Sequence, residues 1–447
     1  MLQIIVILTC VTSVHTFPTS KYKHPILRSS THLGDSSIDV PFCAEASFAN
    51  DNDIKINRIE NDNVKLGYDV SSARGWMEHI EQCDGKMYGV GAYTVLRCDA
   101  IYSSENKCNW KIWGLYFHMN RLCSSYRMLM KKSGIDCMMD GEDDTDTAKS
   151  CEKESKQQTD DMITALLNAA AISLLQEDST KQAHEDEELS RTLMLTILWT
   201  PPKAYDNKSK ECNNVKPIIR AHAAFAGVAR THGGTIDDTL FPSPISACLA
   251  IPSDLTSEAL KMLPCRHSED INDSQLVGAD AKISSWCRIR RPLEDPSRFK
   301  LPGSGVGEVL LVMQDKSKPN IDKLDFINSL DILEGLTSNL FVIYKDGTVR
   351  TAPLSKVLSG YARHLVKEEL DEVKKLTLDE SAPNVKDAKD GLWSEVFVTS
   401  AIRLIIPVNK VLIPQVGEDK PAILWESNCG QPLTRSLWAA VHRRGYK

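Results

Sequence analysis

The 447-residue chain contains no Cys-x-x-Cys pair, no long basic tract, no aromatic RNA-binding motif and no internal repeat. Its 13 cysteines are scattered without regular spacing, so neither a zinc ribbon nor a thioredoxin-like site is expected, and we predict no metal site. A disulfide framework is typical of much shorter secreted chains, which favours reduced and mostly buried thiols here. The formal net charge of −7 argues against binding to nucleic acid or to an anionic membrane. An enzyme that acts on small molecules fits this composition better.

The first 45 residues differ from the rest of the chain in composition. An apolar run near the start is too short and too weakly flanked to predict a membrane span, and we interpret residues 1–16 as a signal peptide. Residues 17–45 are rich in Ser and Thr, have no acidic residue before Asp35, and are expected to be disordered. Together these segments resemble the bipartite plastid presequence of algae with secondary plastids, which predicts a plastid protein that is not membrane-bound once the presequence is removed. The alternative is secretion, with which the Asn-x-Ser sites at Asn207 and Asn272 are compatible.

The remaining chain is long enough for two domains with hydrophobic cores. Apolar residues at helical spacing predict helices over 70–82, 113–132 and 160–175. The acidic stretch 141–160 and the polar stretch 35–65 are expected to be irregular surface segments. Strands are expected at 87–99, 191–199, 215–225, 245–251, 308–313, 339–344, 348–351, 396–399 and 402–407.

These elements predict an α/β fold with a small N-terminal domain over 46–206 and a large C-terminal domain over 217–447. Asp346-Gly347 between two of the strands favours a tight hairpin turn, because both residues accept the positive φ angles that such a turn requires. A helix is expected to follow over 355–372.

Several segments carry groups that can react or bind charge. Lys282 lies in Ala-Lys-Ile-Ser-Ser-Trp, and a lysine amine can form a Schiff base with a carbonyl group. Glu334 lies in Leu-Glu-Gly-Leu-Thr-Ser-Asn-Leu-Phe, directly before a strand. Gly360 opens a predicted helix, where free N–H groups bind phosphate well. Arg121 lies in His-Met-Asn-Arg-Leu, and its guanidinium can donate bidentate hydrogen bonds while remaining charged.

The order of these segments resembles the pyridoxal-phosphate (PLP) enzymes of fold type IV, the class IV aminotransferases, over residues 85–435. The resemblance implies a two-domain α/β fold with PLP in the cleft between the domains, and a homodimer. It also implies transfer of an amino group between a small amino acid and a 2-oxo acid, with branched-chain or D-amino acids as the family's usual substrates. The catalytic residue would be Lys282, which forms the Schiff base. The implied cofactor-binding residues are Arg121, Glu334, Gly360, Tyr361, Ala362, Thr399 and Ser400.

The resemblance also implies a role for each group. A carboxylate at the position of Glu334 keeps the pyridine nitrogen of PLP protonated, so that the ring can accept electrons from a substrate carbanion. Lys282, once released by the substrate, would remove the Cα proton and return it at C4′. Arg121, the helix start at Gly360 and the hydroxyl groups of Thr399 and Ser400 would hold the phosphate.

Lys300 is a rival for the Schiff-base lysine. Its distance along the sequence from Glu334 fits the family better than that of Lys282. However, it lies in Ser-Arg-Phe-Lys-Leu-Pro-Gly, which predicts a loop rather than the strand context expected of the reactive lysine.

The sequence departs from the family pattern at three places. Trp286 and Cys287 occupy the stretch in which a tyrosine commonly supports the phenolic oxygen of the cofactor. Ser359 replaces a common proline, and Ala401 replaces a frequent threonine. Two alternatives therefore stay open: a PLP lyase of the aminodeoxychorismate type, and a non-catalytic member of the fold that acts as a binding protein.

Overall fold

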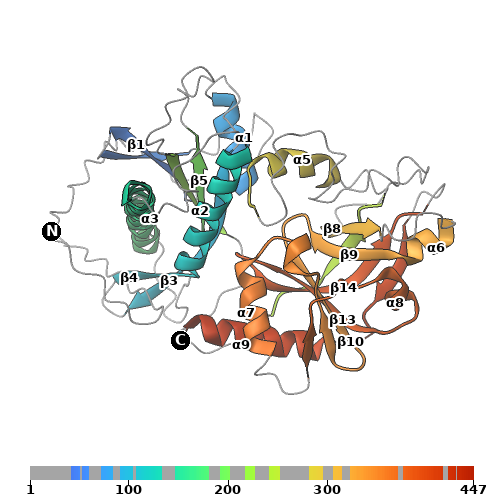
Figure 1. Cartoon of the computed structure of the whole chain (residues 1–447). Coiled ribbons are helices and arrows are strands. Elements are labelled where there is room, and N and C mark those ends of the chain that lie inside the picture. Colours follow the sequence, from blue (N-terminus) through green and yellow to red (C-terminus); the bar gives the residue numbers. More distant parts are fainter. Residues whose placement is uncertain are drawn as a thin grey trace.

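The computed structural model consists of two sheet-based units that lie side by side (Figure 1). It describes residues 42–50, 53–59, 72–83, 91–103, 107–132, 146–180, 192–201, 217–226, 241–251, 281–294, 306–314, 323–370, 376–415, 421–428 and 430–446. Among these residues, no helix is long and apolar enough to cross a membrane. The mixture of strands and helices confirms the α/β class predicted from the sequence.

The first unit contains a six-stranded antiparallel sheet of order β2–β1–β6–β5–β3–β4. Its strands are β1 (Cys43–Asn50), β2 (Asp53–Arg58), β3 (Ala92–Ser103), β4 (Lys107–Ile112), β5 (Thr192–Thr200) and β6 (Ile218–Ala226).

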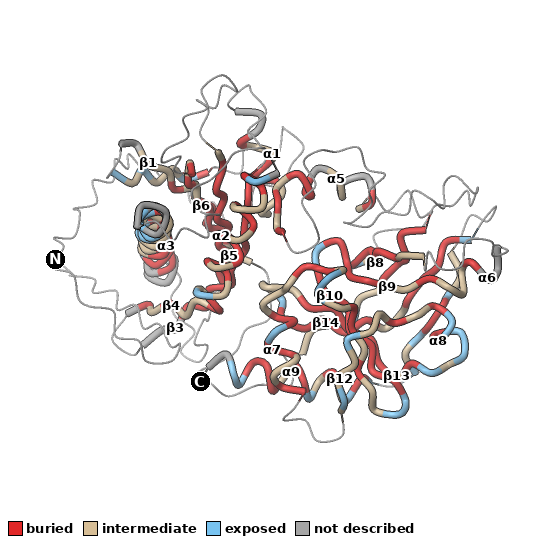
Figure 2. The backbone as a smooth tube through the Cα atoms, viewed as in Figure 1, coloured by how far each residue is buried: buried red, intermediate tan, exposed pale blue. Residues whose placement is uncertain are grey.

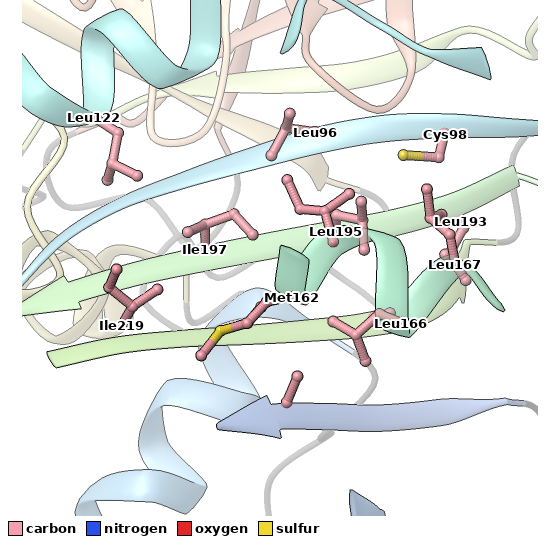
Figure 3. Packing of buried hydrophobic residues seen from close by; sticks show 14 of the residues in the cluster. Leu96, Cys98, Leu122, Met162, Leu166, Leu167, Leu193, Leu195, Ile197 and Ile219 are labelled. Carbon is pink, nitrogen blue, oxygen red and sulfur yellow. The ribbon is translucent and has the colours of Figure 1, made fainter. Parts of the chain in front are cut away.

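Helices cover both faces of this sheet, because alternate residues of a strand point to opposite sides. Leu96 and Ile197 belong to the face that α2 (Leu115–Lys132) and α3 (Asp146–Thr180) cover, and Figure 3 shows them packed with Leu122 and Met162 of these helices. The opposite face, which includes Tyr93, is covered by α1 (Ala73–Cys83). Helix α1 begins after a serine cap, since the Gly75 N–H donates to Ser72 Oγ at 3.0 Å.

The second unit contains a nine-stranded mixed sheet of order β12–β11–β10–β13–β14–β7–β8–β9, with β15 paired to β14. Its strands are β7 (Ile245–Leu249), β8 (Val306–Gln314), β9 (Leu330–Gly335), β10 (Asn339–Tyr344), β11 (Thr348–Arg350), β12 (Thr377–Asp379), β13 (Trp393–Ser400), β14 (Leu404–Ile413) and β15 (Ala422–Glu426). Because β9 also pairs with β10 through Glu334 and Asn339, the strands β10, β13, β14, β7, β8 and β9 form a closed ring.

The ring is filled by one face of its strands and covered by helices on the other. Leu340 and Val342 of β10 belong to the inner cluster, whereas Phe341 and Ile343 belong to the cluster that includes α7 (Tyr361–Leu370) and α9 (Pro432–Tyr446). On β8, the outward residues pack with Trp286 of α5 (Ser285–Glu294). The tube in Figure 2 is correspondingly red along the strands. Short helices α6 (Lys323–Asn328), α8 (Val385–Lys389) and the 3-10 helix η4 (Leu354–Lys356) complete the unit.

The structure corrects the expected limits of the N-terminal segments. Residues 1–41, which include the expected signal peptide, lie outside the described residues. Residues 43–45 were expected in the disordered segment 17–45 but belong to β1, where Cys43 and Ala44 are buried. Strands β1 and β2 likewise replace part of the loosely ordered entry expected over 35–65. The buried residues of β1 are small and β2 has no buried residue, which hides the strand pattern in the sequence.

Two further expectations change. The acidic stretch 141–160 was expected to be a surface loop, but α3 begins at Asp146. Its buried positions there are small and polar: Thr159 Oγ1 accepts a hydrogen bond of 3.1 Å from Trp199 Nε1. The sheets also divide the chain later than the expected limits of 46–206 and 217–447, because β6 belongs to the first sheet.

The hairpin at Asp346-Gly347 is present between β10 and β11, but only Gly347, at φ 89°, has the positive φ that was expected of both residues. The helix expected over 355–372 is interrupted, since residues 357–360 are extended between η4 and α7. In this stretch the Leu358 N–H donates to Glu334 Oε2 at 3.1 Å instead of to a helical carbonyl oxygen.

The two units contact each other through side chains from the first sheet. Arg97 of β3 pairs with Asp99, with Nε 2.9 Å from Oδ1, and its Nη1 donates to the carbonyl oxygen of Ile402 at 2.8 Å. Trp113 Nε1 donates to the same Asp99 carboxylate, and the Trp113 ring contacts His442 of α9 edge-on. This buried network joins the first sheet to the turn after β13.

Candidate active site

Lys282 lies in a short extended segment that adds to the edge of the first unit immediately before α5. Its N–H donates to Ser125 Oγ of α2 at 2.9 Å, and its carbonyl oxygen accepts from the Tyr93 N–H at 2.9 Å. The bridge between Ala92 and Ile283 continues this pairing. The Lys282 side chain is half-buried, and its Nζ lies 5.0 Å from the centre of the Tyr93 ring. The main chain of Lys282 is therefore fixed independently of its amine.

Glu334 lies at the end of β9 and is only 2 % exposed. Its Oε2 accepts from the Leu358 N–H at 3.1 Å and from Asn339 Nδ2 at 3.2 Å. Asn339 Nδ2 also donates to the Leu358 carbonyl oxygen at 2.8 Å. Glu334 is thus tied to β10 and to the segment before α7, which is the arrangement expected of a carboxylate held for a specific task.

A second buried carboxylate, Glu308 of β8, holds the turn that follows Glu334. Its Oε1 accepts from the main-chain N–H groups of Val309 and Leu336, each at 3.1 Å. Its Oε2 accepts from Thr337 Oγ1 at 2.9 Å and from Ser338 Oγ at 2.7 Å. Four donors therefore converge on one side chain, and sequence reasoning gave no role to it.

We expect Glu308→Ala to lower the free energy of unfolding by about 3 kcal/mol, because it leaves several buried donors without an acceptor. Thr337→Ala is the matched control, since the exposed Thr337 loses a single bond and should change the free energy by less than about 1 kcal/mol. Urea unfolding followed by circular dichroism measures both. Equal losses in the two variants would contradict this role of Glu308.

Arg121 of α2 reaches from the first unit to the second. Its Nη1 donates to the Ser359 carbonyl oxygen at 2.8 Å, and its Nη2 donates to Thr94 Oγ1 at 3.0 Å. His118 Nδ1 lies 3.2 Å from the same Nη2 and 2.8 Å from Thr94 Oγ1. Burial, followed by the positive charges of Arg121 and Lys282, holds the pKa of His118 well below its ordinary value. His118 is therefore neutral, and its Nδ1 can accept a bond from the guanidinium.

Gly360, Tyr361 and Ala362 form the start of α7, where the first N–H groups of a helix have no intrahelical partner. A Cβ at Gly360 would lie 2.2 Å from Asn339 Oδ1, so only glycine lets this segment pass so close to Asn339. The Tyr361 ring packs on α2, with its centre 5.4 Å from that of His118. Burial, aided by Glu368, raises the pKa of Tyr361 to about 12. Ala362 is buried in the core, so its main chain alone is available to a ligand.

Thr399 and Ser400 end β13 beside the same cluster. Thr399 pairs in register with Asn339 and is 1 % exposed, and its Oγ1 has no hydrogen-bond partner among the described residues. Ser400 Oγ accepts from the Arg403 N–H at 3.2 Å, which closes the following turn. A buried hydroxyl that has nothing to bind is the kind of atom that a ligand satisfies.

The structure brings the predicted residues together. Contacts run without a break from Arg121 to Ser359, from Leu358 to Glu334, and through Asn339 to Thr399. Lys282 donates its main-chain N–H to Ser125 of α2, one turn after Arg121, so the lysine lies beside the same cluster. Lys300 lies outside the described residues, and the choice between the two lysines stays a prediction.

Trp286 occupies part of the stretch in which the family commonly has a tyrosine. Its ring is buried in the second unit, and its Nε1 donates to the Leu336 carbonyl oxygen at 2.9 Å. It therefore anchors α5 to the turn after Glu334. Cys287 faces the first unit instead, with its Sγ 3.5 Å from the Tyr93 hydroxyl.

The cluster suits the phosphate and ring nitrogen of PLP. Its donors are a guanidinium, a helix start that a Cβ would fill at Gly360, and the unsatisfied hydroxyl of Thr399. A separate buried carboxylate, Glu334, suits a protonated ring nitrogen, and the amine of Lys282 suits a carbonyl carbon.

Residues 304–411 match the family model described as amino-transferase class IV. This segment contains Glu308, Glu334, Gly360 and Thr399, and the match confirms the resemblance to class IV aminotransferases stated from the sequence. A search of curated proteins found no match.

Among solved structures, the chain is similar to the branched-chain aminotransferase from Thermoproteus uzoniensis with norvaline, at 15% identity over 91% of this chain and 95% of that one, with a TM-score of 0.44. The branched-chain amino acid aminotransferase from Thermobaculum terrenum in its PLP form gives 14% identity over 92% of this chain and 95% of that one, with a TM-score of 0.41. A fold IV-transaminase from Curtobacterium pusillum gives 14% identity over 89% of this chain and 98% of that one, with a TM-score of 0.43.

Proposed function

We propose that this protein is a PLP-dependent aminotransferase that moves an amino group between a small amino acid and a 2-oxo acid. The observation that carries the proposal is that Lys282 and Arg121 are both held by α2, and that Arg121 bonds to Ser359 beside Leu358, the residue bonded to the buried Glu334. The class IV match over 304–411 supports the same reaction.

Each residue has a task that its surroundings favour. Lys282 would hold the cofactor through its amine, and the same amine, when free, would carry a proton away from the substrate Cα. Glu334, fixed by Leu358 and Asn339, holds a proton at the pyridine nitrogen. Arg121 and the hydroxyl group of Thr399 bind the phosphate. When bound, PLP supplies the electron sink that stabilises negative charge at Cα.

We further propose a homodimer, as the family resemblance implies, and a location in the plastid. The presequence pattern within residues 1–45 supports that location, with secretion as the alternative. Size-exclusion chromatography with light scattering tests the first, and a fluorescent fusion of the full chain tests the second.

The deciding experiment is spectroscopic. The full chain is purified, supplied with PLP, and its visible absorbance is recorded before and after borohydride, followed by mass spectrometry of the Lys282 peptide. A borohydride-sensitive band that an amino acid removes and a 2-oxo acid restores is the expected result. A protein that shows no such band would instead be a non-catalytic member of the fold. Release of pyruvate without any 2-oxo acid acceptor would replace transamination by the lyase reaction.

A further inference from the structure

Arg97 is a buried arginine of β3 that reaches from the first unit into the second. Its side chain is 2% exposed, and its guanidinium divides between two acceptors. Nε lies 2.9 Å from Oδ1 and 3.1 Å from Oδ2 of Asp99 in the same strand, and Nη1 donates to the carbonyl oxygen of Ile402 at 2.8 Å. The ion pair stays within the first unit, whereas the bond to Ile402 crosses to the turn after β13.

Asp99 holds the Arg97 guanidinium in this orientation. Its carboxylate is 4% exposed and also accepts from Trp113 Nε1 and from Thr192 Oγ1, each at 2.8 Å. The Trp113 ring lies against the guanidinium, with its centre 5.4 Å from Arg97 Cζ. A planar guanidinium can bond to a carboxylate with one edge and to a carbonyl oxygen with another, so Nη1 remains directed at Ile402 while the charge is balanced.

The turn that Arg97 contacts carries part of the proposed phosphate site. Ile402 lies between Ser400 and Arg403, whose hydrogen bond closes the turn. Leu404, which follows, is buried and has a φ of 57°. This left-handed conformation is unfavourable for a leucine and persists only where surrounding contacts enforce it. The bond from Arg97 to Ile402 is such a contact, and it comes from outside the turn.

A second arginine of the first unit bonds to the other proposed phosphate-binding segment. Arg121 Nη1 donates to the Ser359 carbonyl oxygen at 2.8 Å, two residues before α7 begins at Tyr361. The first unit thus contacts one main-chain carbonyl in each of the two segments. Arg97 differs from Arg121 in that the Asp99 carboxylate balances its charge. It is therefore suited to holding the protein chain rather than an anion.

We propose that Arg97 is a positioning residue that holds the turn after β13 where Thr399 and Ser400 can bind the phosphate of the cofactor. The docking of the two units and the shape of the phosphate site are thereby linked through one bond. The value of Arg97 for the reaction rests on the proposed function, whereas its effect on the turn requires no cofactor. From the sequence, Arg97 was expected only as part of the strand over 87–99.

The test removes the bond to Ile402 without leaving a buried charge unbalanced. Arg97→Met combined with Asp99→Asn removes both charges, and the asparagine Oδ1 can still accept from Trp113 and Thr192. Arg97→Lys is the second variant. It keeps the positive charge beside Asp99, but a single ammonium has no second arm with which to reach Ile402.

Arg363→Met is the matched control. Arg363 of α7 is 2% exposed, donates to the Ala352 carbonyl oxygen at 3.0 Å and pairs with Glu380 Oε1 at 2.7 Å, all within the second unit. Hydrogen exchange of the full chain without cofactor is read at the amides of residues 403–404. We expect both Arg97 variants to accelerate this exchange by about tenfold, while the control leaves it unchanged. Unchanged exchange in the Arg97 variants would overturn the proposal.

The second readout separates support of the phosphate site from general stability. The affinities of the full chain for PLP and for pyridoxal, which lacks the phosphate, are measured by absorbance. We expect the Arg97 variants to bind PLP about tenfold more weakly but pyridoxal as tightly as the wild type, while Arg363→Met preserves the ratio of the two affinities. An equal loss for both ligands would refute a role at the phosphate site. If the wild type binds neither ligand, the proposed function fails, and exchange at residues 403–404 still decides the role of Arg97.

Discussion

Lys282→Ala should leave the protein unable to retain PLP through dialysis and should lower transamination by about 10⁴-fold. The amine both anchors the cofactor and moves the substrate proton, so its removal eliminates two functions at once. Folding should hardly change, because the hydrogen bonds of Lys282 to Ser125 and Tyr93 use its main chain. The contact of the side chain with the Tyr93 ring is worth about 0.5–1 kcal/mol.

The measurement combines PLP retention, borohydride labelling and turnover. Lys300→Ala is the matched control and should retain PLP, label with borohydride and turn over like the wild type. Thermal melts should show that both variants are folded. If Lys282→Ala retains a labelled cofactor while Lys300→Ala loses it, the assignment passes to Lys300.

Glu334→Gln should bind PLP within about tenfold of the wild type but lose about 10²–10³-fold in turnover. A glutamine oxygen can still accept from the Leu358 N–H and from Asn339, so the local structure survives. The amide has no negative charge with which to hold a proton at the pyridine nitrogen, so the ring becomes a poorer electron sink.

Stopped-flow measurement of the first half-reaction isolates this step. Asp331→Asn is the control, because it removes the same charge from the same strand, and Asp331 instead accepts a bond from Asn384 Nδ2 at 3.1 Å. The rate of the first half-reaction in Asp331→Asn should match that of the wild type. A Glu334→Gln protein as fast as Asp331→Asn would remove Glu334 from the proposed mechanism.

The parts of the site that could be predicted from the sequence are those encoded by neighbouring residues. The resemblance to the family, carried by the Glu-Gly pair before a strand and by the His-x-x-Arg-Leu segment, pointed to Glu334 and Arg121, and the structure places them against Leu358 and Ser359. Strand β10 and its hairpin followed from alternation and from Asp346-Gly347, which the structure confirms.

The remaining parts depend on contacts between distant residues. Tyr93 meets Lys282, and Asn339 joins Glu334 to Leu358, only because separate segments pack together. The residues next to Glu308 in the sequence do not reveal its role, because its hydrogen-bond donors come mostly from the turn that follows β9. The first part of α3 was predicted to be a loop for a related reason. Its buried Thr159 is polar and binds the Trp199 N–H, so this part of the helix lacks an apolar stripe in the sequence.

The position of β7 also determines when the site can exist during synthesis. This strand lies between β14 and β8 and pairs in parallel with both, and both partners come later in the chain. At about 5–20 residues per second, a ribosome needs roughly ten to thirty seconds to complete β14 after β7 has emerged. The first sheet, by contrast, is complete with β6 at Ala226. The N-terminal unit can therefore fold on the ribosome, whereas β7 is paired on both edges only after β8 and then β14 have been made. A messenger truncated after the codon of Glu334 would accordingly encode nearly every reactive side chain and still yield no site.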